Sequence, residues 1–158
     1  MFKISQKTEY SIRALVELCL RGADRPVPAR EIAASQSIPL RFLEQQIAQL
    51  GRAGLVESLR GSGGGCRLSR DPDRITVAHV VDAMEGPLYP MYCLDPDDHT
   101  CTQDTMCGLQ ELWGEVHAAV RQVFERVTIA DLAQRHRAIA PSSPIWSPSD
   151  LLRPAPRG

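Results

Sequence analysis

The chain has 158 residues, of which 43% are hydrophobic and 23% are charged, a balance typical of a globular protein with one sizeable core. No apolar run approaches the roughly 20 residues that cross a bilayer, and the N-terminus lacks the apolar segment of a signal peptide. We therefore expect a cytoplasmic protein without membrane contact. The net charge of −1 hides an asymmetry, because residues 1–70 carry 11 Lys/Arg against 6 Asp/Glu, while residues 71–158 carry 7 against 13. A basic front part is suited to contact with nucleic-acid phosphates, and a solvated charged surface is the alternative.

Residues 8–20 are predicted to form an amphipathic helix that ends at Gly22. The apolar side chains of this stretch follow the i, i+3, i+4, i+7 spacing of one helix face. They are Ile12, Leu15, Val16 and Cys19.

Two further helices are predicted to form a helix-turn-helix. Pro28 can open a short helix over residues 29–36, and Pro39 suits the first turn of another over residues 40–50. About three residues join the two helices, and the second carries polar residues on its outer face, as in a helix-turn-helix. The face of this second helix that we expect to be buried is made of Leu40, Leu43, Ile47 and Leu50.

A β-hairpin is predicted to follow as a wing. The segment "GLVESLR" alternates like a strand, "GSGGG" interrupts it, and "CRLSR" resumes the pattern. Thr76 can then cap a fourth helix, which Gly86 and Pro87 end.

A long amphipathic helix is predicted over residues 109–127. We infer that its apolar stripe packs against a second copy of the chain, which makes the protein a homodimer; packing back on the wing domain is the alternative. The stripe consists of Leu109, Leu112, Trp113, Val116, Val120, Val123 and Phe124.

Residues 141–158 hold 5 of the 12 prolines and are expected to be disordered.

The predicted fold class is therefore mainly α with a small β-hairpin wing: a winged helix-turn-helix followed by a long C-terminal dimerisation helix. The expected organisation is a DNA-binding domain over residues 1–86, a cysteine-rich cluster-binding loop over 87–108, the dimerisation helix and a short following helix over 109–140, and the tail over 141–158.

Three of the five cysteines, Cys93, Cys101 and Cys107, lie within fifteen residues. A reducing compartment disfavours structural disulfides, so this cluster favours metal binding or redox chemistry. Cys93, Cys101 and Cys107 with His99 could form a tetrahedral zinc site, and free thiols are a further alternative.

Several strings together resemble the Rrf2 family of bacterial winged-helix regulators, which includes IscR and NsrR. They are "KISQKTEYSIRALVEL", "FLEQQIAQL" followed by "AGLVESLRGSGGG", "ITVAHVVDAMEGP", and three clustered cysteines followed by "LQELW". The resemblance covers residues 1 to about 135. It implies a dimer that binds a palindromic double-stranded DNA operator and carries an iron–sulfur cluster on the cysteine loop.

The residue chemistry suits DNA binding. Arg41, Glu44 and Gln45 lie near the start of the third helix, where side chains reach base edges in the major groove, although a solvated helix face is the alternative. At the wing tip, Arg60, Ser62 and Gly63 are expected to approach the sugar-phosphate chain.

Three thiolates leave an iron–sulfur cluster one protein ligand short. The resemblance implies two solutions. In the IscR branch a histidine follows the last cysteine by three residues, and this chain has Gln110 there; in the NsrR branch a carboxylate near the start of the first helix comes from the partner subunit, and this chain has Glu9 there. We therefore predict a 4Fe-4S cluster on Cys93, Cys101, Cys107 and Glu9, with 2Fe-2S as an alternative. An ordinary acid at a helix N-terminus is the other interpretation of Glu9.

These features predict a transcription regulator and not an enzyme. We expect it to repress through DNA binding and to sense nitric oxide, redox state or iron supply.

 The alternatives are a zinc-stabilised DNA-binding regulator without redox sensing, and an iron–sulfur redox protein or electron carrier. The sequence shows no set of residues suited to acid/base catalysis on a substrate and no nucleotide-binding motif, which argues against an enzyme.

Overall fold

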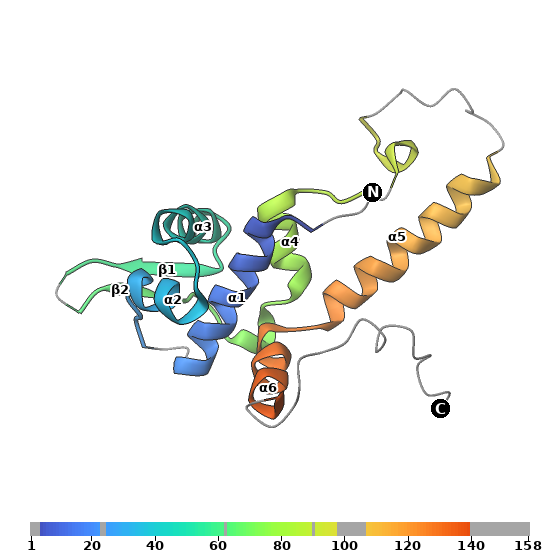
Figure 1. The fold of residues 1–158 in the computed structure, drawn as a ribbon. Helices are drawn as coiled ribbons and strands as arrows, with labels where there is room; N and C mark the ends of the chain where they lie inside the picture. The colour runs from blue at the N-terminus through green and yellow to red at the C-terminus, as the bar shows by residue number, and fades with distance from the viewer. Residues whose placement is uncertain (1–3, 23–24, 62, 90, 98–106, 140–158) are drawn as a thin grey trace.

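The computed structural model describes residues 4–22, 25–61, 63–89, 91–97 and 107–139. This part of the chain is mainly helical with one antiparallel hairpin, which confirms the fold class predicted from the sequence (Figure 1). The expected tail, residues 141–158, lies outside the described residues. The elements are α1 (Gln6–Arg21), α2 (Ala29–Gln36), α3 (Leu40–Arg52), β1 (Val56–Leu59), β2 (Gly65–Leu68), η1 (Pro72–Arg74), α4 (Val77–Glu85), η2 (Tyr92–Leu94), α5 (Gly108–Arg126) and α6 (Ile129–Ile139).

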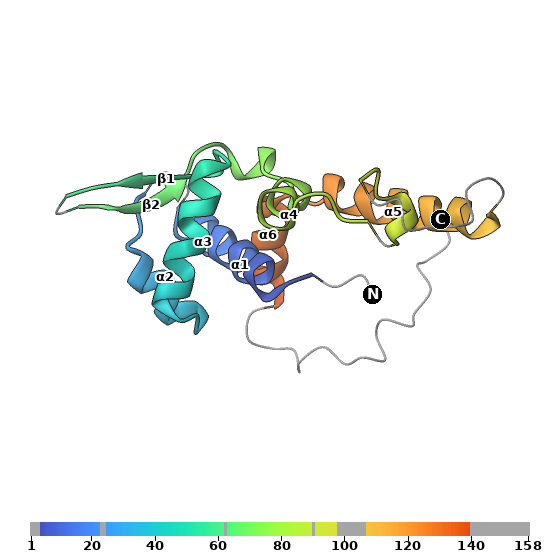
Figure 2. The same cartoon turned by 90° about the horizontal axis from the view of Figure 1, so that it is seen from above.

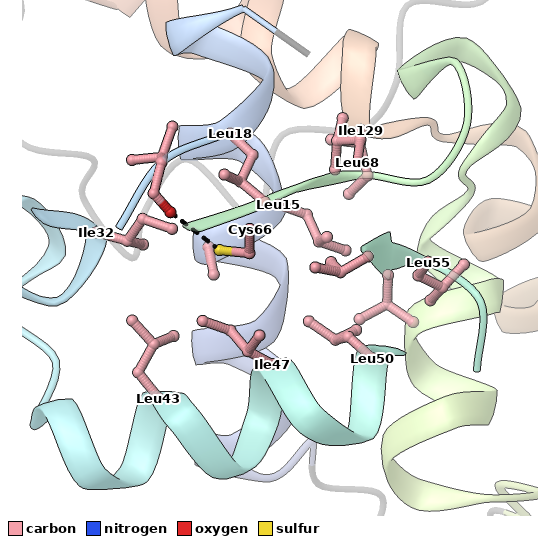
Figure 3. Close-up of a cluster of buried hydrophobic side chains, with 14 of the residues drawn as sticks. Leu15, Leu18, Ile32, Leu43, Ile47, Leu50, Leu55, Cys66, Leu68 and Ile129 are labelled. Carbon is pink, nitrogen blue, oxygen red and sulfur yellow. Dashed lines mark hydrogen bonds between the residues drawn. The ribbon is translucent and has the colours of Figure 1, made fainter. Parts of the chain in front are cut away.

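Helix α1 is the central element of the core. Side chains from α1, α2, α3, both strands and α6 converge on one another around it (Figure 3). Only Leu15 of the face predicted from the sequence is buried, and Ile12, Val16 and Cys19 are partly exposed. All four pack in or against the core, and neighbouring helices enclose α1 on several sides, so that a face with small polar residues is buried as well. The other buried residues of α1 are Thr8, Ser11, Ala14 and Leu18.

Helices α2 and α3 form the predicted helix-turn-helix. Pro28 and Pro39 each occupy the N-cap position, directly before the first residue of their helix. Ser37 in the turn adopts a left-handed conformation with φ 53°, and the Ile38 N–H donates to Ala33 O over 2.9 Å. The prediction that Leu40 is buried was wrong, because this first residue of α3 lies beyond the edge of the core and is 41% exposed.

Strands β1 and β2 form the predicted hairpin, with Val56 opposite Leu68 and Leu59 opposite Gly65. Val27 extends this sheet through two main-chain hydrogen bonds with Cys66, of 2.8 and 2.9 Å. A Cβ on Gly65 would lie 2.5 Å from the Val27 carbonyl carbon, so only glycine permits this close approach. The base of the wing is therefore fixed to the segment that leads into α2.

Helix α4 begins and ends at the predicted residues. The Thr76 side chain accepts a hydrogen bond from the His79 N–H, and Gly86 follows the last turn with φ 77°. Main-chain bonds between Val77 N–H and Val127 O and between Ile129 N–H and Ile75 O, both 2.8 Å, join the start of α4 to the α5–α6 connection. These bonds fix where α5 leaves the winged domain.

Helix α5 contains no buried residue and extends away from the winged domain. The wing and the N-terminal end of α5 lie at opposite ends of the molecule in both views (Figures 1 and 2). One residue of the stripe packs within its own chain: Phe124, at the C-terminal end of α5, contacts the small cluster of Val77, Val81 and Val127. Exposed apolar side chains remain along the rest of the helix at Leu109, Leu112, Val116 and Val123.

Candidate nucleic-acid interface and cysteine site

Helix α3 presents a polar outer face because its opposite face is held in the core by Leu43, Ile47 and Leu50. The three residues predicted to contact bases, Arg41, Glu44 and Gln45, are all exposed on α3. Side chains near the start of a recognition helix can reach base edges in the major groove. The structure therefore presents this predicted set together at one surface.

The turn before α3 is anchored to α1. Arg13 donates from Nε to the Gln36 side-chain oxygen over 3.2 Å and from Nη2 to the Gln36 main-chain carbonyl. The Gln36 amide in turn donates to Glu17 over 2.9 Å. One turn before Arg13, the Tyr10 ring meets Phe42 of α3 edge-on at 5.6 Å. The first half of α1 thus contacts both the turn and the first part of the recognition helix.

The wing tip is built for close approach of its main chain to a partner. Arg60 and Gly63 are exposed, and Ser62 lies outside the described residues. Gly61 has φ 106° and accepts from the Gly64 N–H over 3.0 Å. A Cβ on Gly64 would lie 2.5 Å from Leu59 O, so the turn requires glycine there.

Charge on the hairpin is partly neutralised within the hairpin itself. Arg67 on β2 pairs with Glu57 on β1 at 2.9 Å, and both side chains are exposed. Because an exposed pair of this kind contributes little to stability, Arg67 can exchange Glu57 for a phosphate at small cost. Arg60 is therefore joined on the wing by a second arginine that the sequence alone did not single out.

Two of the three clustered cysteines lie in described residues. Cys93 is in η2, Cys107 precedes the first residue of α5, and both are half-buried free thiols. Gln110, one turn into α5, has its amide nitrogen 3.5 Å from the Cys93 carbonyl oxygen, so the two ends of the cysteine segment approach each other. Cys101 and His99 lie outside the described residues. Residue 110, where the IscR branch would place a histidine ligand, faces the segment as a neutral amide.

An iron–sulfur cluster needs thiolates from a segment that can surround it, and Cys93 and Cys107 fit that requirement. In the described residues no group of three His, Cys, Asp or Glu side chains is close enough to hold a metal ion. The described acids of the segment, Asp95 and Asp97, give it negative charge and no affinity for DNA phosphates.

The remaining cysteines differ from these two in environment. Burial raises the pKa of the Cys66 thiol to about 11, and its Sγ lies 3.4 Å from Val27 O (Figure 3). Burial likewise raises the pKa of Cys19. A raised pKa keeps the sulfur protonated, and metal binding needs the thiolate. Cys66 therefore acts as a small residue of the core.

Glu9, the predicted fourth ligand, lies on the first turn of α1. Its side chain is 62% exposed and pairs with Arg13 over 3.7 Å. A pair this exposed is worth about 0–1 kcal/mol, which is small beside a metal–ligand bond. The structure leaves Glu9 accessible to another subunit and does not join it to the cysteines of its own chain within the described residues.

Sequence patterns did not reveal Glu85, the last residue of α4. Its carboxylate accepts from the Ser5 N–H over 3.1 Å and from the Ser5 and Thr8 hydroxyls, and it pairs with Lys7 at 3.6 Å. Burial alone would raise the pKa of Glu85, but these hydrogen bonds and the Lys7 charge outweigh it, and the pKa lies below its usual value. Glu85 thus joins the end of α4, shortly before the cysteine segment begins, to the start of α1. The contact spans 77 residues between Thr8 and Glu85, so no local pattern signals it.

A helix-turn-helix with a polar recognition face, a glycine-rich wing and a long projecting helix defines a winged-helix DNA-binding protein. No helix among the described residues is long and apolar enough to cross a membrane.

Comparison with known proteins identifies the family. The model of the Rrf2 family, described as "Iron-dependent Transcriptional regulator", matches residues 4–135, and the chain belongs to this family of DNA-binding transcription regulators. It is 33% identical over 131 residues to the HTH-type transcriptional regulator CymR of Bacillus subtilis, covering 83% of this chain and 89% of CymR. It is 32% identical over 137 residues to the regulator NsrR of the same species, covering 87% and 94%. With IscR of Aliivibrio salmonicida the identity is 32% over 130 residues, covering 82% and 76%.

Solved structures agree with the fold. The structure of CymR, the global cysteine regulator of B. subtilis, superposes with a TM-score of 0.74 at 32% identity, covering 85% of this chain and 98% of CymR. T. potens IscR gives a TM-score of 0.72 at 28% identity, covering 90% and 93%. The relatives include proteins with different names within one fold, so the fold identifies a DNA-binding regulator and does not identify its signal.

Proposed function

We propose that this protein is a homodimeric transcription repressor that senses nitric oxide, redox state or iron status through an iron–sulfur cluster. The observation that carries the proposal is that the free thiols Cys107 and Cys93 lie by the start of α5, Cys107 directly before the helix and Cys93 with its carbonyl 3.5 Å from Gln110 Nε2. The start of α5 is the end of that helix farther from the DNA-binding wing (Figure 2). A cluster bound at that position can change its chemical state without covering the surface that binds DNA. A DNA-binding regulator also acts where the DNA is, which supports the cytoplasmic location expected from the sequence.

The cluster ligands are proposed to be Cys93, Cys101, Cys107 and Glu9 of the partner subunit, around a 4Fe-4S cluster, with 2Fe-2S as the alternative. When bound, such a cluster supplies iron that reacts with nitric oxide and oxidants. The exposure of Glu9 and the low cost of breaking its ion pair with Arg13 support its role as a ligand. The acidic segment would lower the reduction potential of the cluster.

The dimer is proposed to form through α5. Its exposed apolar residues recur along one side of the helix, and a second copy is the partner that matches a self-complementary stripe. Two recognition helices related by a two-fold axis read a pseudo-palindromic operator. In this organisation residues 1–86 bind DNA, residues 87–108 hold the cluster, and residues 109–140 join the subunits.

Glu9 lies in the part of α1 that reaches the recognition helix. Arg13, the ion-pair partner of Glu9, donates to the Gln36 carbonyl, and Tyr10, the residue after Glu9, packs on Phe42. If Glu9 bound a different partner, the positions of Arg13 and Tyr10, which both position α3, would therefore change. This connection supports an operator affinity that depends on the state of the cysteine segment.

The test is anaerobic purification followed by an absorption spectrum, assays for iron, sulfide and zinc, and titration with operator DNA. We expect a brown protein with iron and sulfide whose affinity for a specific duplex exceeds that for random DNA at physiological salt. A colourless protein with one zinc per chain would support the zinc alternative, in which Cys93, His99, Cys101 and Cys107 hold the metal. Iron and sulfide without preference for any duplex would support the redox-protein alternative.

A further inference from the structure

Helix α5 has two faces with different surroundings. One face consists of partly buried residues, whose spacing of three and four places them on one side of the helix. They are residues 113, 114, 117, 120, 121 and 124. The exposed apolar residues Leu109, Leu112, Val116 and Val123 lie about 100° away around the helix. The stripe predicted from the sequence therefore divides between a face that packs within the chain and a face that stays exposed.

The partly buried face contacts the winged domain through side chains on successive turns. Phe124 packs on the cluster that contains Val81 of α4. Arg121, one turn earlier, donates from Nη1 to the Asp82 carboxylate of α4 over 2.5 Å. One turn earlier again, the His117 ring lies 5.6 Å from the ring of Tyr89, which follows α4. The direction of α5 is thus fixed from α4 and the segment after it.

The Arg121 guanidinium is oriented from two sides. Its Nη1 donates to Asp82 across the helix contact, and its Nε donates to Glu125 of its own helix over 2.8 Å. A single exposed ion pair contributes little, but a network in which one arginine is shared by two carboxylates restricts the geometry of all three groups. Arg121 therefore joins α5 to α4 in one defined orientation.

Helix α4 connects α5 to the recognition helix through two adjacent residues. Asp82 holds Arg121 of α5, and the carbonyl of Ala83 accepts from Gln49 of α3 over 2.7 Å. Both views show α4 between the helix-turn-helix and α5 (Figures 1 and 2). A rotation of α5 on α4 is consequently a rotation of α5 relative to the helix that is expected to contact bases.

The place of Arg121 on α5 amplifies such a rotation. The C-terminal end of α5 is fixed by the main-chain bond from Val77 N–H to Val127 O. Arg121 lies about 9 Å from Val127 along the helix axis, and the start of α5 lies about 28 Å away. A displacement at Arg121 therefore becomes about three times larger at the start of the helix.

We propose that Arg121 is a positioning residue that sets the distance between the two recognition helices of the dimer, and hence the spacing of the operator half-sites that the protein prefers. Arg121 and Asp82 fix the direction of α5, while the exposed apolar face of α5 joins the second copy. A change in this direction moves the two winged domains relative to each other, and each recognition helix keeps its own base contacts. The inference rests on the dimer through α5 in the proposed function and does not depend on the cluster.

The first measurement establishes the spacing preference of the unaltered protein. An operator is selected from random duplexes with the full-length protein, in whichever form, with or without cluster, binds DNA. Its half-sites are then moved together or apart by one and two base pairs, each of which changes their separation by about 3.4 Å and their relative rotation by about 36°. A dimer with a fixed α5 direction should bind the altered spacings about tenfold more weakly, because the DNA must be deformed.

The second measurement repeats this series with Arg121→Met, which keeps the aliphatic stem and removes the ion pairs. The variant should bind the preferred spacing several-fold more weakly and the altered spacings as well as before, so that the ratio between them falls. Base preference within a half-site should not change. A general loss of stability would lower all affinities by one factor and leave the ratio unchanged. Arg126→Met, at the exposed end of the same helix, is the control and should keep the ratio.

The third measurement tests whether Arg121 acts through Asp82. Asp82→Asn should reduce the ratio as Arg121→Met does, and the double variant should reduce it no further, because the two side chains act as one pair. Exchange of the charges, Asp82→Arg with Arg121→Glu, should restore part of the ratio. Sedimentation checks that every variant remains a dimer, as expected for residues outside the exposed apolar face.

The inference is overturned if the unaltered protein binds all spacings equally, or if Arg121→Met keeps the original ratio. It is also overturned if the effects of Arg121→Met and Asp82→Asn add, or if Arg121→Met is a monomer, because Arg121 then belongs to the dimer contact. A full-length protein that is monomeric or prefers no duplex overturns the proposed function together with the inference. Specific binding by a dimer with an unchanged ratio overturns the inference alone.

Discussion

Arg13 of α1 donates hydrogen bonds to both the side chain and the main-chain carbonyl of Gln36 at the end of α2. The next residue, Ser37, has a left-handed conformation, so the Gln36 carbonyl lies at the point where the chain turns toward the recognition helix. A charged donor on a main-chain acceptor is stronger than a neutral hydrogen bond. Arg13 therefore fixes the geometry of the helix-turn-helix from outside it.

Arg13→Met should lower the free energy of unfolding by about 1–2 kcal/mol and weaken operator binding several-fold, since the turn loses its charged donor while the aliphatic stem is kept. Denaturant unfolding and DNA titration check both values. Arg21→Met on the same helix is the control, because among the described residues Arg21 pairs with the side chains of Glu17 and Glu31 and not with a main-chain carbonyl of the turn. Equal effects of the two substitutions on DNA affinity would contradict a special role for Arg13.

Arg41→Ala should relax base preference at one position in each half-site, at a cost of about 1–3 kcal/mol, because the side chain is exposed on the outer face of α3. Arg60→Ala on the wing should instead weaken binding to all sequences and reduce the salt dependence by about one phosphate contact. Binding to a set of single-base operator variants at several salt concentrations separates the two. Arg126→Ala, at the end of α5, is the control and should change neither.

Cys93→Ala, Cys101→Ala and Cys107→Ala should each abolish the brown colour and the bound iron. Cys19→Ala and Cys66→Ala should retain both, because burial raises the pKa of Cys19 and Cys66 and neither lies in the segment. Iron and sulfide assays with the visible spectrum are the measurements. Cys66→Ala also leaves a small cavity in the core and should lower the Tm. Loss of iron in that variant at a temperature where it stays folded would show that the ligand assignment is wrong.

Glu9→Ala should retain part of the iron, change the spectrum and weaken the dependence of operator affinity on the cluster, because carboxylate is a weaker ligand than the three thiolates. Glu9→Cys should restore full ligation. Glu31→Ala, another exposed acid that pairs with an arginine, is the control. If Glu9→Ala leaves the spectrum, cluster lifetime and operator affinity unchanged, another group is the fourth ligand.

Glu85→Gln should lower the free energy of unfolding by about 1–3 kcal/mol at neutral pH, because the ionised carboxylate that accepts from Ser5 and Thr8 is lost. The pKa of Glu85 in the folded protein lies below its ordinary value of 4.5, so its contribution is complete above that value and declines as the pH falls through the folded pKa. The stability difference between the two proteins should therefore be constant from pH 7 to about 5 and shrink below pH 4.5. A difference that grows on acidification would contradict this account.

The sequence by itself determined the elements of this protein. The cap at Thr76, the stop at Gly86, the prolines before α2 and α3, and the glycines of the wing tip all act within a few residues of where they stand. Such signals depend on local backbone geometry, so they can be read along the chain. The cysteine spacing and the order of motifs likewise pointed to the Rrf2 family, which the comparison confirmed.

Only the tertiary structure decided which faces are buried and which distant residues meet. Periodicity predicts that a helix is amphipathic, but the elements that surround the helix decide which of its residues are buried. For this reason α1 buries Thr8 and Ser11, and Leu40 of α3 is exposed. The contacts of Arg13 with Gln36 and of Glu85 with Thr8 join residues 23 and 77 positions apart. Polar contacts at such separations depend on how helices pack, and helix packing is set by the whole core and not by any one segment.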